Sequence, residues 1–139
     1  MENLNIRTVS AKDAYSQLII ALNKYQENAL FFDLVLLQVL RDGIIQRFEF
    51  TIDALWKALK EQLLVTHKLK IEEIASPRTI FRISKDSGII NLKEFNICME
   101  MIEDRNKTSH TYDNLIAEEV FKSILSSIDT INCILNKIK

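Results

Sequence analysis

Hydrophobic residues recur at intervals of three and four along nearly the whole chain, which is the spacing that places them on one face of an α-helix. The pattern is clearest at the C-terminal end, where the stripe consists of Ile116, Val120, Phe121, Ile124, Ile128, Ile131, Leu135 and Ile138. Similar stripes run through residues 14–25 and 44–63. The sequence therefore predicts an all-α protein, an antiparallel bundle of five or six helices forming a single domain over residues 1–139.

Residues that cap free backbone N–H groups predict where several helices begin. The predicted starts are Ser10 with Asp13, Ser76 with Pro77, and Asn91 with Glu94. Gly88 is a predicted helix end, because glycine readily adopts the left-handed conformation that follows a helix. At Asp42-Gly43 the long apolar pattern can break or restart. A polar stretch over 65–70 predicts a loop.

Residues 29–40 are apolar on every side of a helical projection and include the run LFFDLVLLQVL at 30–40. Such a segment is either a fully buried core helix or a helix that lies in a subunit interface. It carries Asp33 and is far shorter than the roughly 20 residues that cross a membrane. We therefore expect a homodimer or a thick core helix here, and no membrane association.

Glycine and proline are rare: the 139 residues contain two glycines and one proline, where average usage predicts about 17. Tight turns need these residues, so an all-β fold is excluded. Lys and Arg number 18 and Asp and Glu 19, giving a formal charge of -1. A wholly basic surface for non-specific nucleic-acid binding is excluded, but a local basic site is not.

The thiols and two other isolated side chains carry little functional signal. Cys98 and Cys133 have no metal-ligand spacing, and no histidines cluster with them, so no metal site is expected. The N-terminal residues do not resemble a signal peptide, which predicts a cytoplasmic protein with reduced thiols. Trp56 has the helical spacing of a core residue, and His67 lies in a polar loop where we expect it to be solvated.

The polar break between the last two helices holds the candidate chemistry. Arg105 and His110 form an Arg-x4-His motif there. A guanidinium binds phosphate bidentately, and an imidazole can move protons near neutral pH. RNA cleavage without a metal needs little else: a base for the ribose 2′-OH, a cation for the phosphorane and an acid for the leaving oxygen. The alternative is structural: Arg105 pairs with Glu100 or Asp104, and His110 caps a helix. Ser109 has no surrounding nucleophile-elbow motif.

Two further pairs have the four-residue spacing of one helical face. Glu49 and Asp53 could serve acid–base chemistry or a metal, or could be surface charge with Asp53 paired to Lys57. Arg78 and Arg82 would repel each other unless something anionic binds them, which would mean contact with RNA or a partner.

Several blocks of sequence occur in the order typical of one protein group. They are QRFEFTIDALWK at 46–57, SPR at 76–78, EDRN at 103–106 and SHTY at 109–112. The chain thereby resembles the nucleotidyltransferase substrate-binding-like proteins of the HEPN superfamily over residues 10–136. It differs from the usual pattern at Asp53, where the family has Glu, and at Phe95, where Trp is common.

The resemblance implies a helical homodimer that brings two Arg-x4-His motifs together as a metal-independent endoribonuclease toxin. Arg105 would hold the scissile phosphate of the RNA substrate, His110 would act as base or acid, and Asn106 would position the strand. A cognate minimal nucleotidyltransferase antitoxin would transfer AMP onto Tyr112, unless that residue is merely a packed aromatic after the turn. No resident cofactor is implied.

Two other functions fit the same resemblance. The chain could be a non-catalytic substrate-binding subunit of a nucleotidyltransferase, or a purely structural helical dimer. The first alternative predicts that the chain expressed alone is harmless to a bacterial host.

Overall fold

The structure is a computed structural model that describes residues 2–70 and 75–138. Within these residues the chain forms five α-helices, one π-helical turn and one 3-10 turn, and it contains no strand. In order they are α1 (Glu2–Asn28), α2 (Leu34–Glu61), η1 (Gln62–Thr66), α3 (Pro77–Asp86), α4 (Leu92–Lys107), η2 (Thr108–His110) and α5 (Asn114–Lys137). The prediction of an all-α fold is confirmed.

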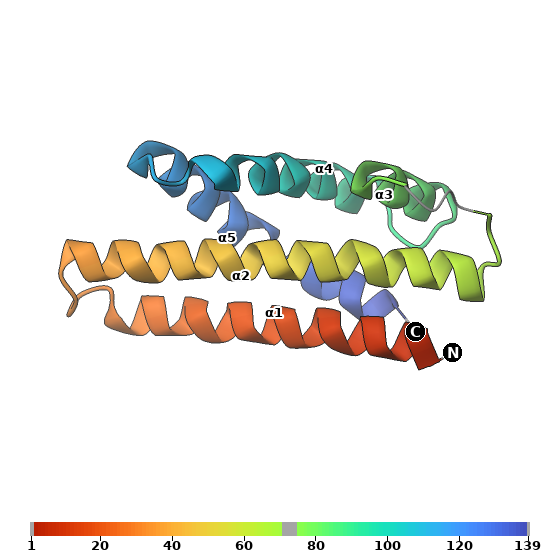
Figure 1. The fold of residues 1–139 in the computed structure, drawn as a ribbon, viewed down its shortest axis with the longest axis horizontal. Coiled ribbons are helices and arrows are strands. Elements are labelled where there is room, and N and C mark those ends of the chain that lie inside the picture. The colour runs from red at the N-terminus through yellow and green to blue at the C-terminus, as the bar shows by residue number, and fades with distance from the viewer. Residues whose placement is uncertain (1, 71–74, 139) are drawn as a thin grey trace.

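Helix α2 is the centre of the bundle and contacts each of the other four helices. It lies antiparallel to α1, with α3 and α4 on its opposite side, while α5 crosses behind it toward the end where both termini lie (Figure 1). Phe48, Ile52, Leu55 and Leu59 of α2 are completely or almost completely buried. The apolar stripe predicted over 44–63 is therefore the buried face around which the other helices pack.

Three of the predicted helix boundaries are confirmed. The Ser76 side chain accepts a hydrogen bond from the Thr79 backbone N–H at 3.2 Å, with Pro77 in the first turn. The full capping box forms between Asn91 and Glu94. Gly88 has φ +80°, the left-handed conformation that glycine adopts without a steric penalty.

Two predicted boundaries are wrong. α1 begins at Glu2, so Ser10 lies within the helix and is exposed. Ala11 next to it is fully buried, because the apolar face of α1 continues through the predicted start. At Gly43, α2 runs on without a break. One glycine costs a helix only about 1 kcal/mol relative to alanine, and the buried Ile44 and Ile45 hold α2 in place.

The segment at 29–40 is not a buried helix. Residues 29–33 form a turn, and α2 starts at Leu34 because Asp33 caps it, accepting from the Leu36 N–H at 2.9 Å. Seven large apolar side chains here are between 39% and 93% exposed; they are Leu30, Phe31, Phe32, Leu34, Val35, Leu36 and Val39. We call these residues the apolar end. The interpretation as a core helix is therefore wrong for the single chain.

Candidate functional site

Arg105 lies near the C-terminal end of α4 and is held by two carboxylates of α2. Its Nη1 lies 3.2 Å from Oε2 of Glu49, and its Nη2 and Nε each lie 3.4 Å from an oxygen of Asp53. The alternative that Arg105 pairs with Glu100 or Asp104 is therefore wrong. The Arg105 side chain is still 37% exposed. The carboxylates therefore fix the orientation of the guanidinium and leave part of it accessible to a ligand.

Thr108 ties η2 to the same guanidinium. Its hydroxyl donates to the Arg105 carbonyl at 2.7 Å and accepts from Arg105 Nη1 at 3.3 Å. The Thr111 hydroxyl in turn donates to the Thr108 carbonyl at 2.9 Å. These bonds hold the turn that carries His110 in a defined position after Arg105.

His110 and Tyr112 both lie on the surface, with ring centroids 6.4 Å apart in an edge-to-face arrangement. Tyr112 is 85% exposed, so the alternative that it is a packed aromatic is wrong. Helix α5 is capped by Asp113, whose side chain accepts from the Leu115 N–H at 2.9 Å. The alternative role of His110 as a helix cap is therefore also wrong.

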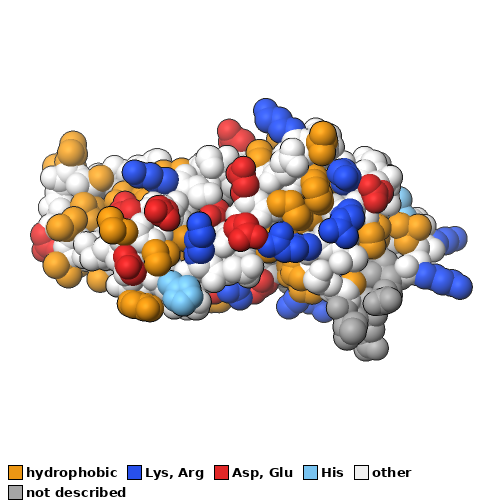
Figure 2. All heavy atoms as spheres, turned by 90° about the horizontal axis from the view of Figure 1, so that it is seen from above, with side chains coloured by type: hydrophobic (Ala, Val, Ile, Leu, Met, Phe, Trp, Pro, Cys, Tyr) orange, Lys and Arg blue, Asp and Glu red, His pale blue; other side chains and the backbone are white. Residues whose placement is uncertain are grey.

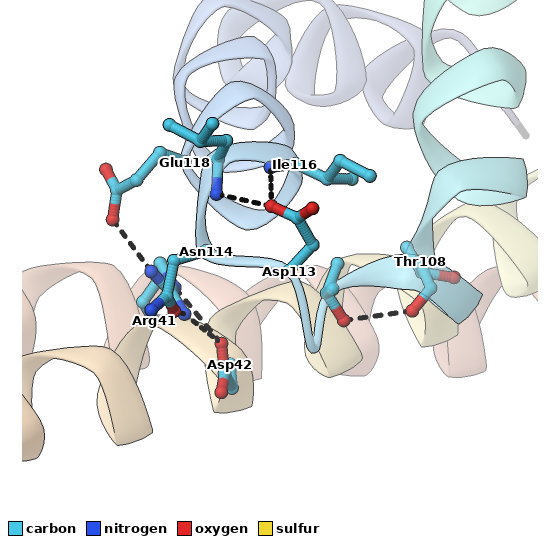
Figure 3. Close-up of polar contacts among 9 residues, drawn as sticks. Arg41, Asp42, Thr108, Asp113, Asn114, Ile116 and Glu118 are labelled. Carbon is cyan, nitrogen blue, oxygen red and sulfur yellow. Dashed lines mark hydrogen bonds and ion pairs between the residues drawn. The ribbon is translucent and has the colours of Figure 1, made fainter.

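A buried arginine that belongs to none of the sequence motifs anchors the start of α5 to α2. Arg41 is 2% exposed and donates to Asp42, to Glu118 at 2.9 Å and to Asn114 at 3.1 Å (Figure 3). Hydrogen bonds to charged groups are among the stronger ones in proteins. The only sequence signal was a lone arginine at the end of an apolar run. Through Asn114, this cluster fixes the segment that follows Tyr112.

Asp104 joins α4 to α5. It is buried and accepts a hydrogen bond from the Ser123 hydroxyl. Burial raises the pKa of Asp104 above its ordinary value, because removal from water penalises the charged carboxylate. Its role is therefore in helix packing and not in neutralising Arg105.

The other candidates are distributed over the molecule. Asn106 is exposed in the same turn of α4 as Arg105. Arg78 forms an ion pair with Glu103, whereas Arg82 is exposed. His67 is exposed after η1, where its Nδ1 lies 3.4 Å from the Gln62 carbonyl.

The two thiols lie in different environments. Cys98 is buried, and burial raises its pKa to about 12, whereas Cys133 is exposed.

Among the described residues, no three His, Cys, Asp or Glu side chains are placed to hold a metal ion. None of the described helices is both long enough and apolar enough to cross a bilayer.

The fold therefore combines a motif that is local in sequence with two residues that are distant from it. Arg105, Asn106, His110 and Tyr112 lie within one helix end and the following turn. Glu49 and Asp53 reach Arg105 only through the packing of α2 against α4. The four-residue spacing in the sequence indicated that Glu49 and Asp53 share a helical face, but it could not show that they contact Arg105.

The chain belongs to the family described as nucleotidyltransferase substrate binding protein like, whose model matches residues 7–139. This match extends over the entire candidate site. A comparison with curated proteins found no match.

Three solved structures are similar to this chain along almost its whole length. The protein ttk003001694 from Thermus thermophilus is 29% identical, with a TM-score of 0.74 and coverage of 93% of this chain and 98% of that one. HI0074 from Haemophilus influenzae is 23% identical, with a TM-score of 0.82 and coverage of 97% and 98%. Its fold is described as that of a substrate binding domain of a nucleotidyltransferase.

The third structure is a toxin–antitoxin with AMP-PNP, one chain of which is 16% identical to this protein. Its TM-score is 0.68, and the alignment covers 98% of this chain and 97% of that chain. At these identities the second and third structures establish the fold alone.

Proposed function

We propose that this protein is a metal-independent endoribonuclease toxin of the HEPN type, with Arg105 and His110 as its catalytic residues. One observation carries the proposal. The exposed imidazole of His110 lies in a turn that Thr108 attaches to Arg105 by hydrogen bonds, and the partly exposed guanidinium of Arg105 is oriented by carboxylates. Membership of the nucleotidyltransferase substrate-binding-like family supports it. The structural likeness to a chain of a toxin–antitoxin supports it as well.

The chemistry needs no water and no metal ion. His110 removes the proton of a ribose 2′-OH, and the resulting oxygen attacks the adjacent phosphorus. Arg105 stabilises the extra negative charge on the phosphorane, since a guanidinium stays charged and binds two phosphate oxygens together. The bond to the 5′-oxygen then breaks, and a protonated imidazole donates a proton to this leaving oxygen. The products are a cyclic phosphate and a free 5′-hydroxyl.

The test uses the purified chain and single-stranded RNA in excess EDTA. Cleavage that leaves a cyclic phosphate end is the expected result, and expression of the chain alone should arrest a bacterial host. Asn106 is proposed to position the strand, because it is exposed beside Arg105. Intact RNA at high enzyme concentration, together with harmless expression, would contradict the proposal.

We also propose that the protein acts as a homodimer joined through the apolar end. Monomeric proteins rarely expose contiguous apolar patches of more than a few hundred Å². The apolar end lies at the α1–α2 turn, at one end of the molecule (Figure 1), and orange spheres are also spread over the rest of the face drawn in Figure 2. Arg41 joins Asn114, the first residue of α5, to the part of α2 that follows the apolar end, so the turn that carries Tyr112 lies next to this surface. A dimer formed here would bring the two catalytic turns toward each other.

Val35→Asp is expected to convert the dimer to a monomer and to reduce RNA cleavage, because a charge cannot be buried unpaired in an apolar interface. Sedimentation velocity at several protein concentrations measures the change. Val9→Asp is the matched control, since Val9 is similarly exposed on α1 outside the apolar end. A wild-type chain that sediments as a monomer at all concentrations would rule out the dimer.

The cognate minimal nucleotidyltransferase antitoxin is proposed to silence the toxin by modifying Tyr112. The phenol oxygen of Tyr112 would attack the α-phosphorus of ATP, form a new P–O bond, and release pyrophosphate and the phenol proton. The product places a phosphate and an adenosine beside the His110 ring, where they repel and block an RNA phosphate. The high exposure of Tyr112 supports its access to a second enzyme.

Tyr112→Phe is expected to prevent the addition of AMP and to leave the toxin active in the presence of its partner. Mass spectrometry of the protein after incubation with the partner and ATP measures the modification. Tyr15 and Tyr25 are internal controls because both are partly buried. A modification that maps to another residue would disprove the assignment to Tyr112.

A second candidate function is a non-catalytic subunit that presents a substrate to a nucleotidyltransferase. The family description and the description of HI0074 favour it. It predicts no toxicity from the chain alone and no cleavage in EDTA. The two functions are therefore separated by the same experiments.

A further inference from the structure

A small groove lies between the first part of α1 and the segment formed by the end of α2 and the start of η1. Its volume is about 230 Å³, and it is lined by Arg7, Trp56, Lys57, Lys60, Glu61 and Leu64. We call it the Trp56 groove. Trp56 is the one tryptophan of the 139 residues, and it is only half-buried because it packs on the edge of the core. Its helical spacing in the sequence predicted only a place in the core.

The charges around this groove favour an anion. Three basic residues and one acidic residue line it, in a protein whose formal net charge is -1. Lys57 Nζ lies over the Trp56 ring, 5.9 Å from its centroid, so a base that stacks on this face displaces the ammonium to the side. Asp53, the expected partner of Lys57, contacts Arg105 instead. Among the described residues, neither Arg7 nor Lys57 has an ion-pair partner, so both can bind an external phosphate.

The Trp56 groove lies next to the candidate active site along α2. Glu49, Asp53 and Lys57 are spaced by four residues, so they lie along one face of the helix. One helical turn advances about 5.4 Å. The cations and ring of the groove therefore begin about one turn beyond the carboxylates that hold Arg105.

Cations beside an accessible aromatic ring are the features with which proteins bind single-stranded nucleic acid. The cations follow the phosphates, and the ring stacks on a base. We propose that the Trp56 groove binds one nucleotide of single-stranded RNA, with its base stacked on Trp56 and its phosphate beside Arg7 and Lys57. The path of the RNA strand from this groove to Arg105 rests on the proposed function, because the proposed function places the scissile phosphate at Arg105.

The test uses the full-length protein and a 12-nucleotide single-stranded RNA with 2′-O-methyl groups throughout. This RNA cannot be cut because it lacks the 2′-OH nucleophile. Since the chain has one tryptophan, its fluorescence reports on this groove directly. We expect the RNA to quench Trp56 fluorescence in a saturable way. A double-stranded RNA of the same length should quench it much less, because its bases are already stacked.

Substitutions in the groove should weaken binding in distinct ways. Arg7→Ala with Lys57→Ala should raise the dissociation constant and reduce the dependence of log K on log salt by about 0.7 per lost phosphate contact. Trp56→Leu should raise the dissociation constant of a labelled RNA by about 5- to 150-fold, the range for one stacked base. Lys93→Ala with Lys122→Ala removes the same charge from exposed positions outside the groove, and should bind as the wild type does.

The outcomes separate this inference from the proposed function. If the wild type does not cut RNA but still shows quenching that Arg7→Ala with Lys57→Ala weakens, and Trp56→Leu weakens binding of the labelled RNA, the ribonuclease proposal fails and the Trp56 groove stands. If the wild type cuts RNA while both groove variants bind and cut normally, the groove assignment is overturned alone. Absence of quenching, or equal weakening by the Lys93 and Lys122 control, also overturns it.

Discussion

His110→Ala is expected to lower RNA cleavage by at least about 100-fold, because a positioned acid or base contributes roughly 10²- to 10⁴-fold to a reaction. The side chain is exposed at the end of η2, so its loss should leave the thermal unfolding midpoint nearly unchanged. Initial rates on single-stranded RNA in EDTA measure the effect. Circular dichroism of the same preparation verifies the fold.

Ser109→Ala is the matched control, since Ser109 is exposed in the same turn and has no proposed role. It should cleave at the wild-type rate. Arg105→Ala should also reduce cleavage strongly, and Arg105→Lys should restore only part of the activity, because lysine lacks the planar fork that holds two phosphate oxygens. Undiminished cleavage by His110→Ala would show that another group moves the proton.

Phe48→Ala is expected to destabilise the protein by about 3–5 kcal/mol, the cost of replacing a buried phenylalanine by alanine in a packed core. Phe48 is fully buried in α2, the helix that contacts all the others. The substitution leaves a cavity that the surrounding helices cannot fill without distortion. Urea unfolding followed by circular dichroism, at one fixed protein concentration, measures the loss.

Phe50→Ala is the control for the same chemical change two residues away. Phe50 is 56% exposed, so its removal should cost less than about 1 kcal/mol. The difference between the two losses in free energy of unfolding tests whether α2 buries the face that contains Phe48. Equal losses for the two variants would mean that α2 buries a different face.

Local chemistry explains which helix boundaries could be predicted. Ser76 and Asn91 were identified correctly, because a cap is a contact between a side chain and backbone atoms two or three residues away. Ser10 has the same local signal, but it lies on the exposed face inside α1. The packing of α1 against α2 overrides that signal.

The candidate site also contains both residues that are close in the sequence and residues that only packing brings together. Arg105, His110 and Tyr112 lie within eight residues, so their association is visible in the sequence. Asp53 contacts Arg105 across 52 residues, and only the packing of α2 against α4 brings the two together. For the same reason Arg41 could not be identified, because its partners Asn114 and Glu118 lie on α5.

The amino-acid sequence by itself determined that this protein is all-helical, because the spacing of its apolar residues and its scarcity of glycine and proline act locally on the backbone. Only the tertiary structure decided which apolar residues are buried. Phe48 lies inside the bundle, whereas Phe31 and Val35 are exposed. Burial depends on which surfaces other helices cover, and hydrophobicity alone does not specify those contacts.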